Sequence, residues 1–120
     1  VAPSRGLGDV YKRQVPGESA MTKKLTRFGY VQLTAQKDNV LCQKGGQING
    51  HEFHYSDSTN NGAGFMAAKA SGRGSWECAH TSDALYAGYP HIHLWGNPTF
   101  AQNFVQHCVQ FAAKKYGMPE

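Results

Sequence analysis

Two short stretches of the sequence hold four of its six histidines: residues 50–56 (GHEFHYS) and residues 89–95 (YPHIHLW). Residues two apart in an extended strand share a face, so Glu52 is expected beside His54 and His91 beside His93. A carboxylate that meets an imidazole fixes its tautomer and raises its basicity. This is what a general base or a thiol-activating histidine needs.

Three interpretations of these histidines stay open on the residues alone. In the first they are partly buried, hydrogen-bonded members of a β structure. In the second they form a small zinc-binding module through His51/His54 and His91/His93, with Cys78 nearby. His51 and His54 fall on opposite faces of a strand, however, and the set matches no fixed ligand spacing. In the third, His91 serves a thiolate nucleophile, although no cysteine here lies in a Gly-flanked strand-to-helix turn.

The cysteines and the hydropathy indicate a cytoplasmic protein that does not span a membrane. Cys42, Cys78 and Cys108 are widely spaced and include no Cys-x-x-Cys pair, which argues against a disulfide framework and a zinc ribbon. No apolar run approaches the roughly 20 residues that a membrane-spanning helix needs. The 120 residues are enough for one small domain.

The first fourteen residues are expected to be non-native. Residues 9–14 (DVYKRQ) look like a translated transposon adapter from sequencing libraries, so residues 1–14 are excluded from the fold prediction. Half of the formal charge of +4 lies in this tail. Residues 1–14 carry three basic and one acidic side chain, and residues 15–120 carry nine basic and seven acidic side chains. The remaining +2 is dispersed, which gives little support to nucleic-acid binding.

Short strands precede a helix in the predicted element order. Residues 28–34 alternate as a strand that places Val31 and Leu33 on one face and polar or aromatic residues on the other. Residues 48–55 are also strand-like, and residues 65–70 and 75–78 flank a Gly-containing turn, which predicts a hairpin.

The last element is predicted to be a helix. Asn97 is a favoured N-cap, Pro98 suits the first helical position, and Gly117 is suited to the C-terminal cap. Apolar residues recur at helical spacing at Phe100, Phe104, Cys108, Phe111 and Ala112. Cys108 is therefore expected in the core rather than as a nucleophile.

The chain resembles a known family in the order and spacing of four strings. Residues 28–31 (FGYV), 50–56 (GHEFHYS), 87–93 (AGYPHIH) and 96–98 (GNP) resemble the C-terminal end of cobyrinic acid a,c-diamide synthases. The resemblance runs from about residue 16 to residue 116, and its most specific part is GHEFHYS. It identifies residues 15–120 as the C-terminal part of a class I glutamine amidotransferase domain.

The resemblance implies an α/β, flavodoxin-like domain and a glutamine-dependent ligase of cobalamin biosynthesis. In this family an N-terminal domain uses ATP and Mg²⁺ to activate the a and c carboxylates of the corrinoid, and glutamine supplies ammonia. Cobyrinic acid, its cobalt-free counterpart and nickel-sirohydrochlorin are plausible acceptors. Nothing in this chain is expected to bind the cofactors, and no nucleic acid or membrane partner is implied.

His91 matches the family histidine that activates the nucleophilic cysteine. That cysteine lies upstream in the family, so the chain is expected to be truncated, inactive as a glutaminase on its own, and left with exposed apolar surfaces and marginal stability. His93 stands where related amidotransferases have a glutamate. Glu52 or a backbone carbonyl is therefore hypothesised to orient His91, with His51, His54 and His93 as further site-lining residues.

Overall fold

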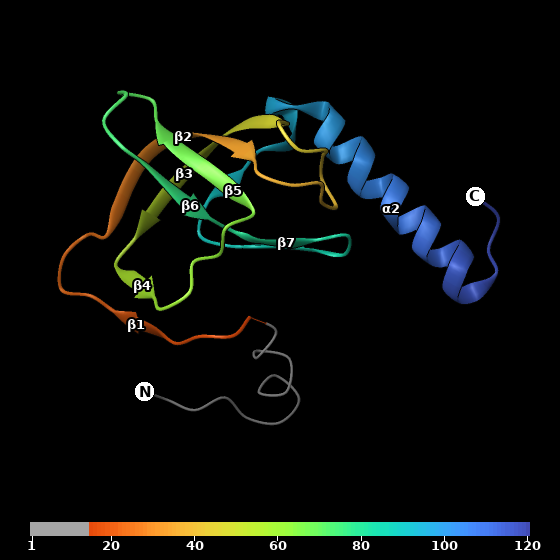
Figure 1. Cartoon of the computed structure of the whole chain (residues 1–120), viewed down its shortest axis with the longest axis horizontal. Helices are drawn as coiled ribbons and strands as arrows, with labels where there is room; N and C mark the ends of the chain where they lie inside the picture. The colour runs from red at the N-terminus through yellow and green to blue at the C-terminus, as the bar shows by residue number, and fades with distance from the viewer. Residues whose placement is uncertain (1–14) are drawn as a thin grey trace.

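A computed structural model describes residues 15–120, drawn in colour in Figure 1. The predicted non-native tail, residues 1–14, lies outside the described residues. The elements, in chain order, are β1 (Ser19–Met21), β2 (Arg27–Ala35), β3 (Gln47–His54), β4 (Ser56–Ser58), β5 (Phe65–Lys69), β6 (Ser75–Cys78), β7 (His80–Ser82), β8 (Leu85–Ala87), β9 (His91–Ile92), the 3₁₀ helix η1 (Leu94–Gly96) and α2 (Pro98–Tyr116).

Five strands form the central sheet in the order β6-β5-β2-β3-β9, and every neighbouring pair is antiparallel. The predicted hairpin is confirmed: β5 pairs with β6, and Gly72 and Gly74 in the turn have positive φ values of 78° and 117°. Glycine adopts such values without the steric cost that a Cβ imposes. The pairs β1–β4 and β7–β8 form two smaller sheets.

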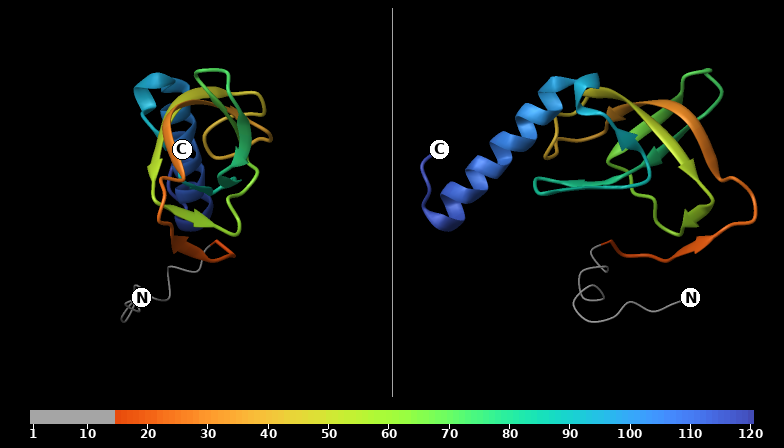
Figure 2. Two further views of the ribbon diagram at one scale, coloured as in Figure 1. Left: turned by 90° about the vertical axis from the view of Figure 1, so that its left-hand side faces the viewer. Right: turned by 180° about the vertical axis from the view of Figure 1, so that it is seen from behind.

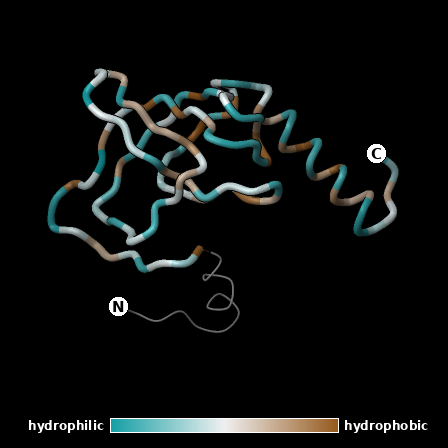
Figure 3. The backbone as a smooth tube through the Cα atoms, viewed as in Figure 1, coloured by the Kyte–Doolittle hydropathy of each residue, from teal (hydrophilic) through white to brown (hydrophobic). Residues whose placement is uncertain are grey.

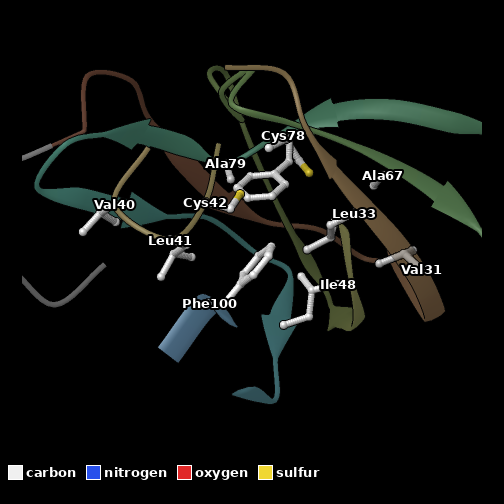
Figure 4. Packing of buried hydrophobic residues seen from close by; sticks show 12 residues of the cluster. Val31, Leu33, Val40, Leu41, Cys42, Ile48, Ala67, Cys78, Ala79 and Phe100 are labelled. Carbon is white, nitrogen blue, oxygen red and sulfur yellow. The ribbon is translucent and has the colours of Figure 1, made fainter. Parts of the chain in front are cut away.

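Alternation along β2 divides the sheet into a buried face and an open face. Val31 and Leu33 are buried, whereas Tyr30 and Gln32 are exposed, as the sequence predicts. The buried face carries the apolar core, which gathers around Leu33, Phe65 and Phe100. Figure 4 shows Phe100 projecting into this cluster from the start of α2.

Both predicted helix caps are confirmed. The Asn97 side chain accepts a hydrogen bond from the Thr99 amide at 3.2 Å, and Pro98 occupies the first helical position. Asn97 also donates to the Gln47 carbonyl at 2.8 Å, which ties the helix start to β3. At the other end Gly117 is left-handed, with φ 66°. The helix therefore begins and ends where its local signals place it.

The predicted burial of Cys108 is wrong. Of the apolar stripe only Phe100 is buried, and Phe104, Cys108 and Phe111 are exposed. The reason is the direction of α2, which contacts the rest of the domain through Phe100 and Asn103 in its first two turns and then runs outward, as Figures 1 and 2 show. Figure 3 shows apolar segments recurring along the part of α2 that runs away from the sheet.

The described residues are α/β in the broad sense that strands precede one C-terminal helix. Within them no two named strands pair in parallel, and Gly62 and Ala79 form an isolated parallel bridge. Parallel strands need crossover connections of a dozen or more residues, usually helical, and the strands here are joined by short turns and loops.

Candidate active site

His91 lies on the edge strand β9, on the open face of the sheet. Strand β9 pairs with β3 so that His91 faces His51 and Ile92 faces Gly50. The His91 side chain is exposed. A Cβ at position 50 would lie 3.0 Å from the His91 carbonyl oxygen, so the glycine permits this close approach of the two strands.

Three of the predicted site histidines meet on this face. His51, His91 and His93 line a shallow hollow of about 240 Å³ together with Tyr30 and Asn49. His93 caps η1, with Nδ1 accepting a hydrogen bond from the Trp95 amide at 3.3 Å. In a neutral His93 the proton is then on Nε2.

The open face beside His91 is aromatic. The His51 ring makes edge contacts with Tyr30 at 5.1 Å and with Phe28 at 5.9 Å between ring centroids, and Phe28 in turn contacts Phe53 at 5.4 Å. Tyr30 is 74% exposed, and Phe28 and Phe53 are more than half exposed. These rings form an exposed aromatic cluster on the open face.

Glu52 and His54 lie on the opposite face, where they meet each other and not His91. Glu52 Oε1 is 3.3 Å from His54 Nε2, and both side chains are largely buried. The predicted shared face of Glu52 and His54 is thus observed. The hypothesis that Glu52 directly orients His91 finds no contact in the structure, because adjacent residues of β3 point to opposite faces and His51 is the one that faces His91.

Both ring nitrogens of His54 have a hydrogen-bond partner. Nδ1 is 2.8 Å from the Ser56 carbonyl oxygen, which only accepts, so Nδ1 donates. The other ring nitrogen, Nε2, faces the Glu52 carboxyl group. Glu52 Oε2 is buried and has no hydrogen-bond partner among residues 15–120.

The segment that leads into His91 is held by three side-chain contacts. The rings of His54 and Tyr89 stack, with centroids 3.8 Å apart and planes 8° apart. The Tyr89 hydroxyl hydrogen-bonds Ser56 Oγ at 2.9 Å. The Tyr86 hydroxyl donates to the Pro90 carbonyl at 3.0 Å. These contacts join the end of β3, the start of β4 and β8 to the two residues that precede His91.

No cysteine on the buried face is suited to act as a nucleophile. Burial raises the pKa of Cys78 to about 12, and the nearby Glu52 carboxylate adds to the shift. Burial also raises the pKa of Cys42. A thiol with a raised pKa is mostly protonated at neutral pH and reacts slowly. Cys108 is exposed on α2.

The zinc alternative is not supported. Within residues 15–120 no group of three or more His, Cys, Asp or Glu side chains is arranged to hold a metal ion. His51 and His54 point to opposite faces of β3, as the strand period requires. Among the described helices none is long and apolar enough to cross a membrane.

The chain is similar in sequence to cobyrinate a,c-diamide synthases from several bacteria. The chain is 37% identical over 99 residues to the cobyrinate a,c-diamide synthase of Caldanaerobacter subterraneus, which is 81% of this chain and 22% of that relative. It is 35% identical to the synthase of Salmonella typhimurium over 76% of the chain and 21% of the relative. The Fusobacterium nucleatum synthase is 38% identical over 79% of the chain. Over this shared segment the chain belongs to the cobyrinate a,c-diamide synthase family.

The chain spans about a fifth of the length of the curated synthases that it matches. No family model matches the chain, and no solved structure matches it.

Sequence reasoning missed the residues that surround the segment before His91. Tyr86, Tyr89 and Ser56 were not among the predicted site residues, although Tyr89 and Ser56 belong to the two strings that resemble the cobyrinate a,c-diamide synthases. The stack of Tyr89 on His54 joins residues that are 35 positions apart. Local periodicity carries no signal for such a contact.

Proposed function

We propose that the chain is the C-terminal part of the glutaminase domain of a cobyrinate a,c-diamide synthase, in which His91 activates a cysteine supplied by a part of the enzyme outside this chain. The observation that carries the proposal is the exposed position of His91 in a hollow on the open face of the sheet. The identity to synthases over about 80% of the chain supports the substrate class.

The chemistry assigned to His91 is proton transfer at a thiol and at an amide nitrogen. Its imidazole accepts the thiol proton, and the thiolate attacks the carboxamide carbon of glutamine. The imidazolium then returns the proton to the departing nitrogen, which leaves as ammonia while a glutamyl thioester forms. Water attacks the thioester and releases glutamate, and the thiolate is regenerated. Each step needs a second polypeptide surface to bring the cysteine to His91.

The amide-forming half of the reaction is assigned to the remainder of the enzyme. When bound there, ATP and Mg²⁺ would supply the activation of the a and c carboxylates of a corrinoid. The described residues offer no group of three or more His, Cys, Asp or Glu side chains arranged to hold a metal ion, and the sites for Mg²⁺ and ATP are assigned to the remainder of the enzyme. The three free cysteines are in keeping with a cytoplasmic enzyme.

The flavodoxin-like fold is part of the same proposal. The antiparallel sheet described here would join parallel strands contributed by the rest of the domain. The exposed aromatic residues Phe28, Tyr30 and Phe53 support this reading, because a surface that packs against another layer of a domain is expected to be apolar.

The test is a comparison of the isolated chain with a chimera. In the chimera, residues 15–120 replace the matching stretch of the Salmonella typhimurium synthase. We expect ammonia release from glutamine and corrinoid amidation by the chimera, and no ammonia release by the isolated chain. Glutamine hydrolysis by the purified isolated chain would contradict the proposal, because it would require a nucleophile within these residues.

A further inference from the structure

We propose that Glu52, His54 and Tyr89 form a clamp that positions the His91 strand, acting through contacts on the face opposite His91. The catalytic meaning of this clamp rests on the function proposed above for His91. The clamp itself rests on the geometry of residues 52–56 and 86–91. In it Glu52 holds the His54 ring, the His54 ring holds Tyr89, and Tyr89 fixes the start of β9.

The first link is the fixed orientation of the His54 ring. Its two nitrogens are engaged at opposite ends, by the Ser56 carbonyl oxygen at 2.8 Å and by Glu52 Oε1 at 3.3 Å. The side chain of His54 is 11% exposed and that of Glu52 is 4% exposed, so water competes weakly for these contacts. Rotation of the ring would break both contacts and leave buried polar groups unpaired.

The second link is the stack between His54 and Tyr89. Ring planes 8° apart with centroids 3.8 Å apart allow little sliding or tilting. The far end of Tyr89 is held by the hydrogen bond of its hydroxyl to Ser56 Oγ at 2.9 Å. The face of the tyrosine ring is therefore held by the last residue of β3, and its hydroxyl by the first residue of β4.

The third link explains why β9 needs such support. Strand β9 contains only His91 and Ile92, and it pairs with β3 at two positions. Pro90, directly before it, has no amide hydrogen to extend the ladder. So short a strand at a sheet edge is weakly held by its own pairing. The clamp on Tyr89 and the bond from Tyr86 to the Pro90 carbonyl supply the missing restraint.

The experiment is NMR spectroscopy of the full 120-residue chain. In the unchanged protein we expect cross-strand nuclear Overhauser effects between the backbone protons of His51 and His91. Tyr89→Leu removes both the stack and the hydroxyl, and we expect these signals to be lost while those between Tyr30 and His51 in the β2–β3 pair persist. Tyr89→Phe keeps the ring, and we expect it to retain the His51–His91 signals.

Two further variants make the test decisive. His54→Gln removes the stacking ring but leaves a side chain that can hydrogen-bond Glu52, and we expect the same selective loss at β9. Tyr55→Leu removes a neighbouring, partly exposed tyrosine that contacts Phe53, and we expect no loss. Persistence of the His51–His91 signals in both Tyr89→Leu and His54→Gln would overturn the clamp. Because this readout involves no glutamine chemistry, it is independent of whether His91 acts in catalysis.

Discussion

Glu52 and His91 lie on opposite faces of the β3–β9 pair. His51 is the residue of β3 that faces His91, while the next residue, Glu52, points to the buried face and places Oε1 3.3 Å from His54 Nε2. The carboxylate in GHEFHYS therefore acts on the second histidine of its own string. Its influence on His91 is indirect, through the position of β9.

This arrangement predicts a small effect of Glu52→Gln on turnover. Glutamine has nearly the same shape and keeps a hydrogen-bonding group beside His54. In the chimera we expect glutaminase kcat to fall by less than about threefold, which corresponds to under about 0.7 kcal/mol. A much larger fall with KM unchanged would show that the Glu52 charge acts on the reaction itself.

The buried pair predicts unequal effects on stability. In His54→Leu the Glu52 carboxyl group is left buried without its partner, and we expect the free energy of unfolding to fall by about 3 kcal/mol. Replacing both residues by leucine removes the unpaired group, and we expect a smaller loss than in the single variant. Urea unfolding of the three proteins measures this difference. Equal losses in the single and double variants would argue against a mutually compensating pair.

The packing of α2 predicts that alanine substitutions at two phenylalanines of its apolar stripe have different effects on stability. Phe100 is 1% exposed and Phe104 is 48% exposed. We expect Phe100→Ala to lower the free energy of unfolding by about 3 to 5 kcal/mol. Phe104→Ala is the matched control, with an expected change within about 0.5 kcal/mol in the isolated chain. Similar losses at both positions, measured by urea unfolding, would contradict the exposure of Phe104.

Buried thiols predict a loss of stability in alkali. The Cys78 thiol ionises near pH 9.0 when it is unperturbed, and burial raises its pKa in the folded protein to about 12. Between these values the unfolded chain releases a proton that the folded protein retains, so the free energy of unfolding falls as pH rises. For this one group the equilibrium constant of unfolding rises by up to about tenfold per pH unit. Burial raises the pKa of Cys42 and of Tyr86 as well, which adds in the same direction.

The control for this pH dependence is Cys78→Ala. We expect its free energy of unfolding to decline less steeply between pH 9 and pH 11 than that of the unchanged chain, because one raised pKa is absent. Parallel curves for the two proteins would mean that Cys78 does not titrate in the way that its burial implies.

Local features of this chain could be predicted from the sequence, and features set by distant contacts could not. The strand around Val31 and Leu33, the hairpin at residues 71–74 and the cap at Asn97 follow from side-chain period, turn chemistry and capping, which are properties of neighbouring residues. The exposure of Cys108 depends on the direction in which α2 leaves the sheet. Helical period defines a stripe without stating what covers it.

In the candidate site, too, local relationships could be predicted and contacts between distant residues could not. The shared face of Glu52 and His54 followed from the period of two residues along a strand. The residue of β3 that faces His91 is set by the register between the two strands. A register shifted by one residue would place Glu52 opposite His91 in place of His51. The stack of His54 on Tyr89 depends on that register too, and no local signal specifies it.

The most direct test of the account is glutaminase turnover in the chimera with His91→Ala. General acid–base catalysis by a positioned histidine contributes about 10² to 10⁴ in rate, so we expect kcat to fall by at least about a hundredfold. The matched control is His107→Ala, a histidine on α2 that contacts the Asn103 carbonyl oxygen, and we expect it to retain full turnover. A His91→Ala enzyme with turnover close to that of the His107→Ala enzyme would contradict the assignment of His91 as the residue that activates the cysteine.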